Sequence, residues 1–229
     1  MPRHTDREYE SELERLRERI LYMGARVEKL VSTAFAALEQ RDPTPAAAAI
    51  GMDPEIDHLE IEVDELCLRV LARRQPVASD LRFITTTLKL VTDLERVADL
   101  GVNIAERVVE LAGLAEVKTV HERLQEMASI SLGMLRDALD AFVSADALKA
   151  EQIMDRDAAV DSLYSSIFPT LVAQITADIH HVEQATRLQS IGKYIERIAD
   201  HATNIAEMVV FMVRGQDIRH HGDFGVGHG

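Results

Sequence analysis

The chain has 229 residues, enough for one large domain or two small ones, and its 25 basic and 39 acidic side chains give a formal charge of −14. That acidic excess and an aromatic content of only 4% exclude a dedicated nucleic-acid-binding protein, which needs basic surface and stacking rings. The single cysteine, Cys67, cannot form an intramolecular disulfide, and the N-terminal segment is charged from its start. We therefore expect a cytoplasmic protein that reaches a membrane only through partners.

Six helices are predicted from apolar residues that recur at steps of three and four. The first carries a narrow stripe from Leu13 to Leu38 and ends at Asp42-Pro43-Thr44-Pro45. The second spans the stripe from Ile56 to Val70, and the third runs from Ser79, a plausible N-cap, to Leu111. Three more are expected over about 117–143, 146–177 and 183–213, with a flexible tail after them.

The second half of the chain repeats the first. Residues 95–109 and 196–210 are identical at ten of fifteen positions, at an offset of 101. A fainter match aligns residues 53–59 with 157–163. The fold class is therefore all-α, as two tandem, internally repeated three-helix bundles. The predicted units are 1–113 and 114–215, followed by the tail 216–229.

Acidic residues four positions apart occur in equivalent places of both repeats. On a helix this spacing stacks two carboxylates on one face, where they repel each other by a few tenths of a kcal/mol. Further polar residues extend the third-helix stripe of each repeat. The pairs are Asp53/Asp57, Glu95/Asp99, Asp157/Asp161 and Glu196/Asp200, and the extensions are Asn103, Glu106, Asn204 and Glu207.

These acidic stripes lie opposite the apolar stripes of the same helices, taking about 100° per residue. They are therefore expected on the surface, between neighbouring helices. One interpretation is a solvated face of an acidic protein. The other is a group of hard-cation sites, since carboxylate and amide oxygens suit Mg²⁺, Mn²⁺, Ca²⁺ or ferric iron.

Other chemistry is not supported by the sequence. Glu55-x-x-His58 matches half of a di-iron motif that needs a second copy, and the nucleotide-binding and zinc-protease motifs are absent. Cys67 is interpreted as a buried spectator, and His180, His181 and His201 as surface histidines. No nucleophile with a base and an orienting group can be assembled, so the sequence does not predict an enzyme.

The repeated ER-[V/I]-A-D-x-x-x-N-I-A-E motif, the acidic pairs and the segment Pro76–Arg82 together resemble the PhoU family of phosphate-uptake regulators. The resemblance covers nearly the whole chain. It implies a cytoplasmic, non-enzymatic negative regulator that acts on the high-affinity phosphate ABC transporter, through its ATPase subunit, and on a sensor histidine kinase. It also implies metal clusters of iron or another ion, such as Mg²⁺, Mn²⁺, Ca²⁺ or Zn²⁺, on the E/D-x-x-x-D motifs.

Two departures from an even repeat affect the expected sites. Pro54 follows Asp53, and a residue before proline is disfavoured in the α region. In the second repeat Tyr164 and Phe168 replace Glu60 and Asp64, so that half offers fewer carboxylates. We therefore expect the repeats to differ in metal content.

Two functions and one assembly follow as hypotheses. The first function is a metal-bearing regulatory adaptor, and the alternative is a metal-storage or metal-handling protein. Extra apolar residues on the third helix (Val91, Val102 and Val109) and the long first helix suggest a homodimer, as the family often forms.

Overall fold

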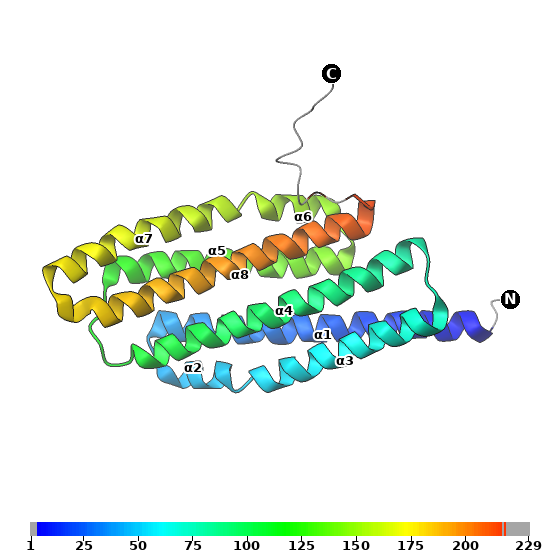
Figure 1. The fold of residues 1–229 in the computed structure, drawn as a ribbon, viewed down its shortest axis with the longest axis horizontal. Coiled ribbons are helices and arrows are strands. Elements are labelled where there is room, and N and C mark those ends of the chain that lie inside the picture. Colours follow the sequence, from blue (N-terminus) through cyan, green and yellow to red (C-terminus); the bar gives the residue numbers. More distant parts are fainter. Residues whose placement is uncertain (1–3, 217, 219–229) are drawn as a thin grey trace, which may run out of the picture.

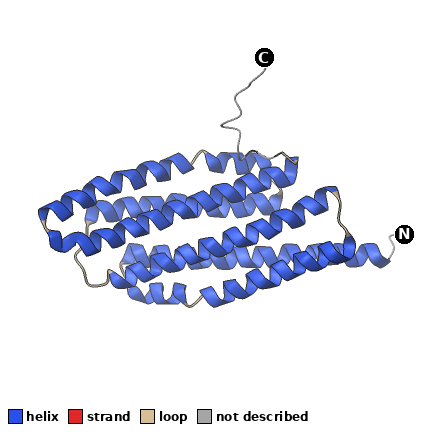
Figure 2. Cartoon of the chain, viewed as in Figure 1, coloured by secondary structure: helices blue, strands red, loops and turns tan. Residues whose placement is uncertain are grey.

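The computed structural model describes residues 4–216 and residue 218 (Figure 1). Across these residues the only regular secondary structure is helical (Figure 2), which confirms the all-α prediction. The elements are α1 (His4–Gln40), α2 (Pro43–Ile50), α3 (Asp53–Arg74), α4 (Ala78–Glu110), α5 (Lys118–Ser144), α6 (Ala147–Met154), α7 (Asp157–Ala177), η1 (Ile179–His181) and α8 (Val182–Arg214).

The helices form two bundles that follow the sequence repeat. In the first, α1 packs against α3 and α4, and in the second α5 packs against α7 and α8. The bundles lie side by side along α4 and α8 and also touch through α1 and α5 (Figure 1). Buried residues of both halves make one continuous core. The tandem arrangement is confirmed, while the division at residue 113 stays a prediction and the tail 216–229 lies outside the described residues except for 216 and 218.

The second helix of each repeat is interrupted, which the apolar pattern did not show. Proline-rich residues 42–45 end α1, as predicted, but they also begin α2. Asp42 Oδ1 accepts a hydrogen bond from Thr44 N at 2.8 Å, and Pro43 takes a first-turn position where its missing N–H costs nothing. The continuous helix expected over 146–177 is wrong, because a turn at 155–156 separates α6 from α7. Ser79 is not an N-cap, since α4 begins one residue earlier.

A close approach of α1 and α4 fixes the first bundle. Gly101 of α4 faces Leu30 of α1, and a Cβ at Gly101 would stand 2.5 Å from Leu30 Cδ2. Leu30 is completely buried, so its side chain has no space into which it could retreat. Gly101 therefore allows α4 to lie closer to α1 than any larger residue would.

The apolar residues that suggested self-association are only partly available. Val91 is completely buried inside the molecule, which contradicts its expected role on an outer surface. Val102 is half-buried and packs against the core, and Val109 is exposed. Among the described residues, no helix combines the length and the apolar content needed to cross a bilayer.

Candidate functional site

The first acidic cluster lies on the outer face of the first bundle, between α3 and α4. Asp53 is the first residue of α3, and Pro54 occupies the first turn without displacing it from the helix. Burial raises the pKa of Asp53, and the negative charges of Asp57 and Asp99 raise it further. Asp53 therefore lies close enough to Asp57 of α3 and to Asp99 of α4 to interact with both charges.

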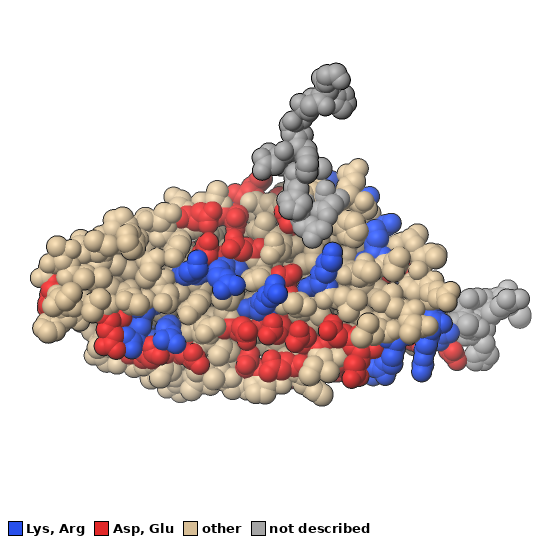
Figure 3. Space-filling model, viewed as in Figure 1, with Lys and Arg blue, Asp and Glu red and all other residues tan. Residues whose placement is uncertain are grey.

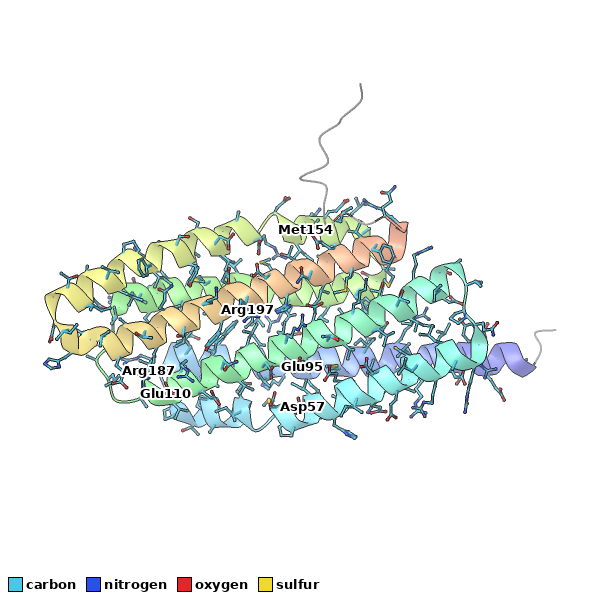
Figure 4. All side chains as sticks on the ribbon, in the orientation of Figure 1. Asp57, Glu95, Glu110, Met154, Arg187 and Arg197 are labelled. Atoms are coloured by element: carbon cyan, nitrogen blue, oxygen red, sulfur yellow. The ribbon has the colours of Figure 1, made fainter. Side chains whose placement is uncertain are left out.

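Glu95 connects the two helices of this cluster. Burial raises the pKa of Glu95, and the charges of Asp99, Glu60 and Asp57 add to the rise. Figure 4 shows Asp57 of α3 and Glu95 of α4 near each other on neighbouring helices. Carboxylates from two helices thus share one half-buried surface, as the stripe geometry predicted.

Two members of the first cluster are missing from the ligand set proposed from the sequence, namely Glu60 and Asp64. Burial raises the pKa of Glu60, followed by the charges of Asp64, Asp57 and Asp99. Burial also raises the pKa of Asp64. Their spacing would have identified them, because positions 53, 57, 60 and 64 follow one helix face at steps of four, three and four.

The second acidic cluster lies between α7 and α8. Burial raises the pKa of Asp157, and Asp161 and Asp200 raise it further, while the Thr203 hydroxyl, 3.5 Å from Asp157 Oδ1, opposes the rise. Burial likewise raises the pKa of Glu196, with Asp200 as the largest charge effect. The four predicted acids of this repeat therefore lie together.

The second cluster has fewer carboxylates than the first. Tyr164 takes the place of Glu60, and its hydroxyl accepts a hydrogen bond from Gln189 at 2.9 Å. Phe168 takes the place of Asp64 and is largely exposed. Figure 3 shows acidic side chains gathered over α3 and α4 and, in a smaller group, over α7 and α8, among other acidic side chains of the same face.

The polar residues that extend the third-helix stripes do not share the surroundings of the cluster carboxylates. The Asn103 side-chain amide donates to the Asp99 carbonyl of its own helix at 2.8 Å, and Glu106 pairs with Arg107 at 3.6 Å. Asn204 is exposed and Glu207 is half-buried. Neither Glu106 nor Glu207 is among the charges that shift the pKa values of the two clusters.

Three cluster oxygens are buried and accept no hydrogen bond from another described residue. They are Asp53 Oδ1 and Asp64 Oδ1 in the first cluster and Glu196 Oε2 in the second. A buried acceptor without a donor is costly, and a carboxylate oxygen in that state suits a hard cation. The donor set therefore fits an oxygen-ligated ion, although no three acidic, histidine or cysteine side chains of the described part already stand at metal-ligand geometry.

Histidine and cysteine lie beside the carboxylates of these clusters and not among them. Burial and the charge of Asp161 raise the pKa of Asp200, and His201 opposes that rise. The expectation that His201 is a surface histidine is wrong. It is buried between the bundles, where its Nδ1 lies 2.6 Å from Asp93 Oδ1 of α4. Cys67 is buried as predicted, and burial raises the pKa of its thiol to about 12. His201 thus belongs to the contact between α4 and α8, and Cys67 to the core.

Comparisons with known proteins agree with this architecture. A family model described as the PhoU domain matches twice, over residues 20–108 and 124–209. The chain is 37% identical over 219 residues to a Pseudomonas putida protein named "Phosphate-specific transport system accessory protein PhoU homolog", covering 96% of this chain and 86% of that one. The crystal structure of PhoU from Pseudomonas aeruginosa has a TM-score of 0.87 and 37% identity, covering 91% of this chain and all of that one.

A second solved structure has the same fold. The phosphate transport system regulatory protein PhoU from Streptococcus pneumoniae has a TM-score of 0.82 and 32% identity, with 92% of this chain and 99% of that chain covered. The fold and the paired carboxylate faces define a tandem-repeat helical protein with a carboxylate cluster on the surface of each repeat. The chain belongs to the PhoU family, whose named members are accessory and regulatory proteins of phosphate transport.

Proposed function

We propose that this protein is a negative regulator of phosphate uptake and of phosphate-starvation signalling, acting as a metal-binding adaptor. Its partners are the ATPase subunit of the phosphate ABC transporter and the sensor histidine kinase. The adaptor is cytoplasmic, carries no catalysis of its own and forms a homodimer. The observation that carries the proposal is the pair of carboxylate clusters at equivalent positions of the two repeats, in a chain whose named relatives belong to phosphate transport.

The metals bind to the oxygens of the two clusters. Asp53, Asp57, Glu95 and Asp99 supply the first site, with Glu60 and Asp64 beside them. The second site is made by Asp157, Asp161, Glu196 and Asp200. A bound cation would relieve the like-charge repulsion within each cluster and would give the buried orphan oxygens a partner.

The carboxylates need only turn about their side-chain torsions to meet a cation. Without a metal, mutual repulsion favours rotamers that keep the charges apart, and solvent-facing side chains change rotamers readily. A metal of oxygen preference, such as Mg²⁺, Mn²⁺, Ca²⁺ or ferric iron, fits this donor set better than a thiophilic one. Since the first cluster has six carboxylates and the second has four, the first takes up more metal.

Metal storage is the alternative function, because the clusters alone would also suit it. The two functions differ in their partners. An adaptor binds the transporter ATPase or the kinase, and that binding changes when the metal sites are lost. A storage protein takes up many ions per chain and forms no stable complex with either partner.

The test is affinity capture of the purified ATPase subunit and kinase by the wild type, by Glu95→Gln/Glu196→Gln, and by Glu10→Gln/Glu14→Gln as a control. The control neutralises two exposed acids of α1, a helix that carries no member of either cluster. The adaptor function predicts capture by the wild type and the control in Mn²⁺, and weaker capture by the cluster variant or in chelator. Capture of neither protein by the wild type would contradict it.

A further inference from the structure

A row of basic side chains occupies the face between the two acidic clusters. Lys89 and Arg96 lie on α4, and Lys193 and Arg197 lie on α8, all four exposed. Figure 3 shows Lys and Arg side chains along this middle face, and Figure 4 labels Arg197 on it. We call these four residues the cationic row.

The side chains of the cationic row are not ion-paired with any described residue, although the protein is strongly acidic. None of its members forms an ion pair within 4.0 Å or a side-chain hydrogen bond with a described residue. Arginines nearby behave differently: Arg187 bonds to Glu110 at 2.7 Å, and Arg214 bonds to Glu151 at 2.5 Å. With 39 acids against 25 bases in the chain, unpaired cations in one place are not explained by a shortage of carboxylates.

The fold places the two arginines of the row at similar levels along the neighbouring helices α4 and α8. His201 of α8 meets Asp93 of α4 at 2.6 Å, and Arg187 meets Glu110 at 2.7 Å, so α4 and α8 run antiparallel. This register places Arg96 within about one helical turn of Arg197. The two arginines also occupy equivalent positions of the repeat, since each follows the glutamate of its ER-[V/I]-A-D motif.

The carboxylates beside the row do not neutralise it through contact. Arg96 acts on Glu95, and Arg197 and Lys193 act on Asp200, but in each case burial has the larger effect and leaves the carboxyl pKa raised. Both arginines are exposed, and their guanidinium groups repel each other wherever they approach. An anion bound between them would attract both groups and offset that repulsion.

We propose that the cationic row binds phosphate-type oxyanions, with Arg96 and Arg197 as the central pair. A guanidinium group presents a planar fork of N–H donors that matches two phosphoryl oxygens, and Lys adds a point charge. Lys89 and Arg96 are seven residues apart, about 10 Å along α4, so the row also suits a short phosphate chain. The inference rests on the proposed function for its choice of phosphate among the oxyanions.

The experiment is calorimetric titration of the metal-free protein at low ionic strength with orthophosphate, tripolyphosphate and sulfate. We expect tripolyphosphate to bind more tightly than orthophosphate or sulfate, because it carries more negative charge and spans more of the row. Arg96→Gln/Arg197→Gln should weaken tripolyphosphate binding about tenfold or more, since it removes both forks. Arg69→Gln/Arg73→Gln, which removes two exposed arginines of α3, should change the affinity less than about twofold.

The proposal is overturned if neither phosphate binds, if both double variants weaken binding alike, or if tripolyphosphate binds no more tightly than sulfate. Thermal melting checks that each variant is folded. If the glutamine variant does not fold, Arg96→Lys/Arg197→Lys replaces it, because this variant keeps both charges. It should still weaken tripolyphosphate binding several-fold, since lysine lacks the guanidinium fork. Unchanged affinity of this variant would overturn the proposal. A parallel Mn²⁺ titration separates this inference from the proposed function, because Arg96→Gln/Arg197→Gln leaves every cluster carboxylate in place.

Discussion

Neutralising part of the first acidic cluster should change stability in opposite directions with and without metal. The variant Glu95→Gln/Asp99→Asn removes five like-charge interactions, those of Glu95 with Asp99, Glu60 and Asp57, and those of Asp99 with Asp53 and Glu60. At about 0.2–0.5 kcal/mol each, their loss stabilises the metal-free protein by about 1–2.5 kcal/mol. For a chain of this size that raises the melting temperature by about 2–10 °C.

Saturating metal should reverse the order of stability. A ligand at a hundredfold excess over its Kd stabilises the folded state by about 2.7 kcal/mol per site. The wild type gains this at the first cluster and the variant does not, while the second cluster responds alike in both proteins. Thermal melting of both proteins, each in chelator and in excess Mn²⁺, gives the four melting temperatures to compare. An equal response of variant and wild type to Mn²⁺ would refute the reasoning and leave the cluster as a solvated acidic face.

The pH dependence has a defined sign. Because the pKa of Glu95 is raised in the folded protein, the folded state holds its proton more tightly than the unfolded chain. The favourable contribution is fully present below the unfolded pKa and is lost as pH rises through the folded pKa. In chelator, the stability advantage of the variant should therefore be largest at neutral pH and should shrink as the pH falls towards the ordinary carboxyl range. An advantage that grows on acidification would contradict this.

Three further outcomes are expected. Gly101→Ala should lower the free energy of unfolding in urea by about 1–3 kcal/mol, because the added Cβ overpacks against α1. Gly133→Ala is the control: its Cβ would meet nothing closer than 3.6 Å, so it should stabilise the protein by about 0.5–1 kcal/mol. Equal effects of the two variants would refute the close approach. His201→Ala should cost about 1–3 kcal/mol by leaving Asp93 without its partner, and a neutral effect would contradict the contact. Cys67 should resist alkylation in the folded protein at pH 8 and react only on unfolding, as followed by mass spectrometry.

Much of the fold could be predicted from the sequence, because the internal repeat and the apolar stripes indicate the same helices. Each long helix buries a stripe at steps of three and four, so its approximate bounds follow from the pattern. The short helix α2 and the break at 155–156 escaped prediction because the apolar spacing alone marks neither feature. The cap at Asp42, followed by Pro43, was the local signal for a helix start.

The candidate site was predictable in part for a similar reason. Helical spacing puts Glu95 and Asp99 on one face, and the repeat then indicates Glu196 and Asp200. Which neighbouring face the acids meet depends on how α3 packs against α4, which spacing within one helix does not determine. Glu60 was therefore left out of the proposed ligands although it lies among them.

The contact between the bundles could not be predicted from periodicity. His201 lies on a helix with acidic neighbours, and a single helix gives no sign that a second bundle covers it. Its burial follows from the packing of α4 on α8, which also pairs it with Asp93. The arginines of the cationic row lie at similar levels along these helices for the same reason.

Anomalous scattering from crystals of the wild-type protein grown with Mn²⁺ tests the central claim most directly. The account predicts anomalous peaks among the carboxylates of α3 and α4 and of α7 and α8, with more metal in the first cluster. Glu95→Gln/Asp99→Asn should lose the first set of peaks and keep the second. Wild-type crystals with no peak at either cluster would contradict the account.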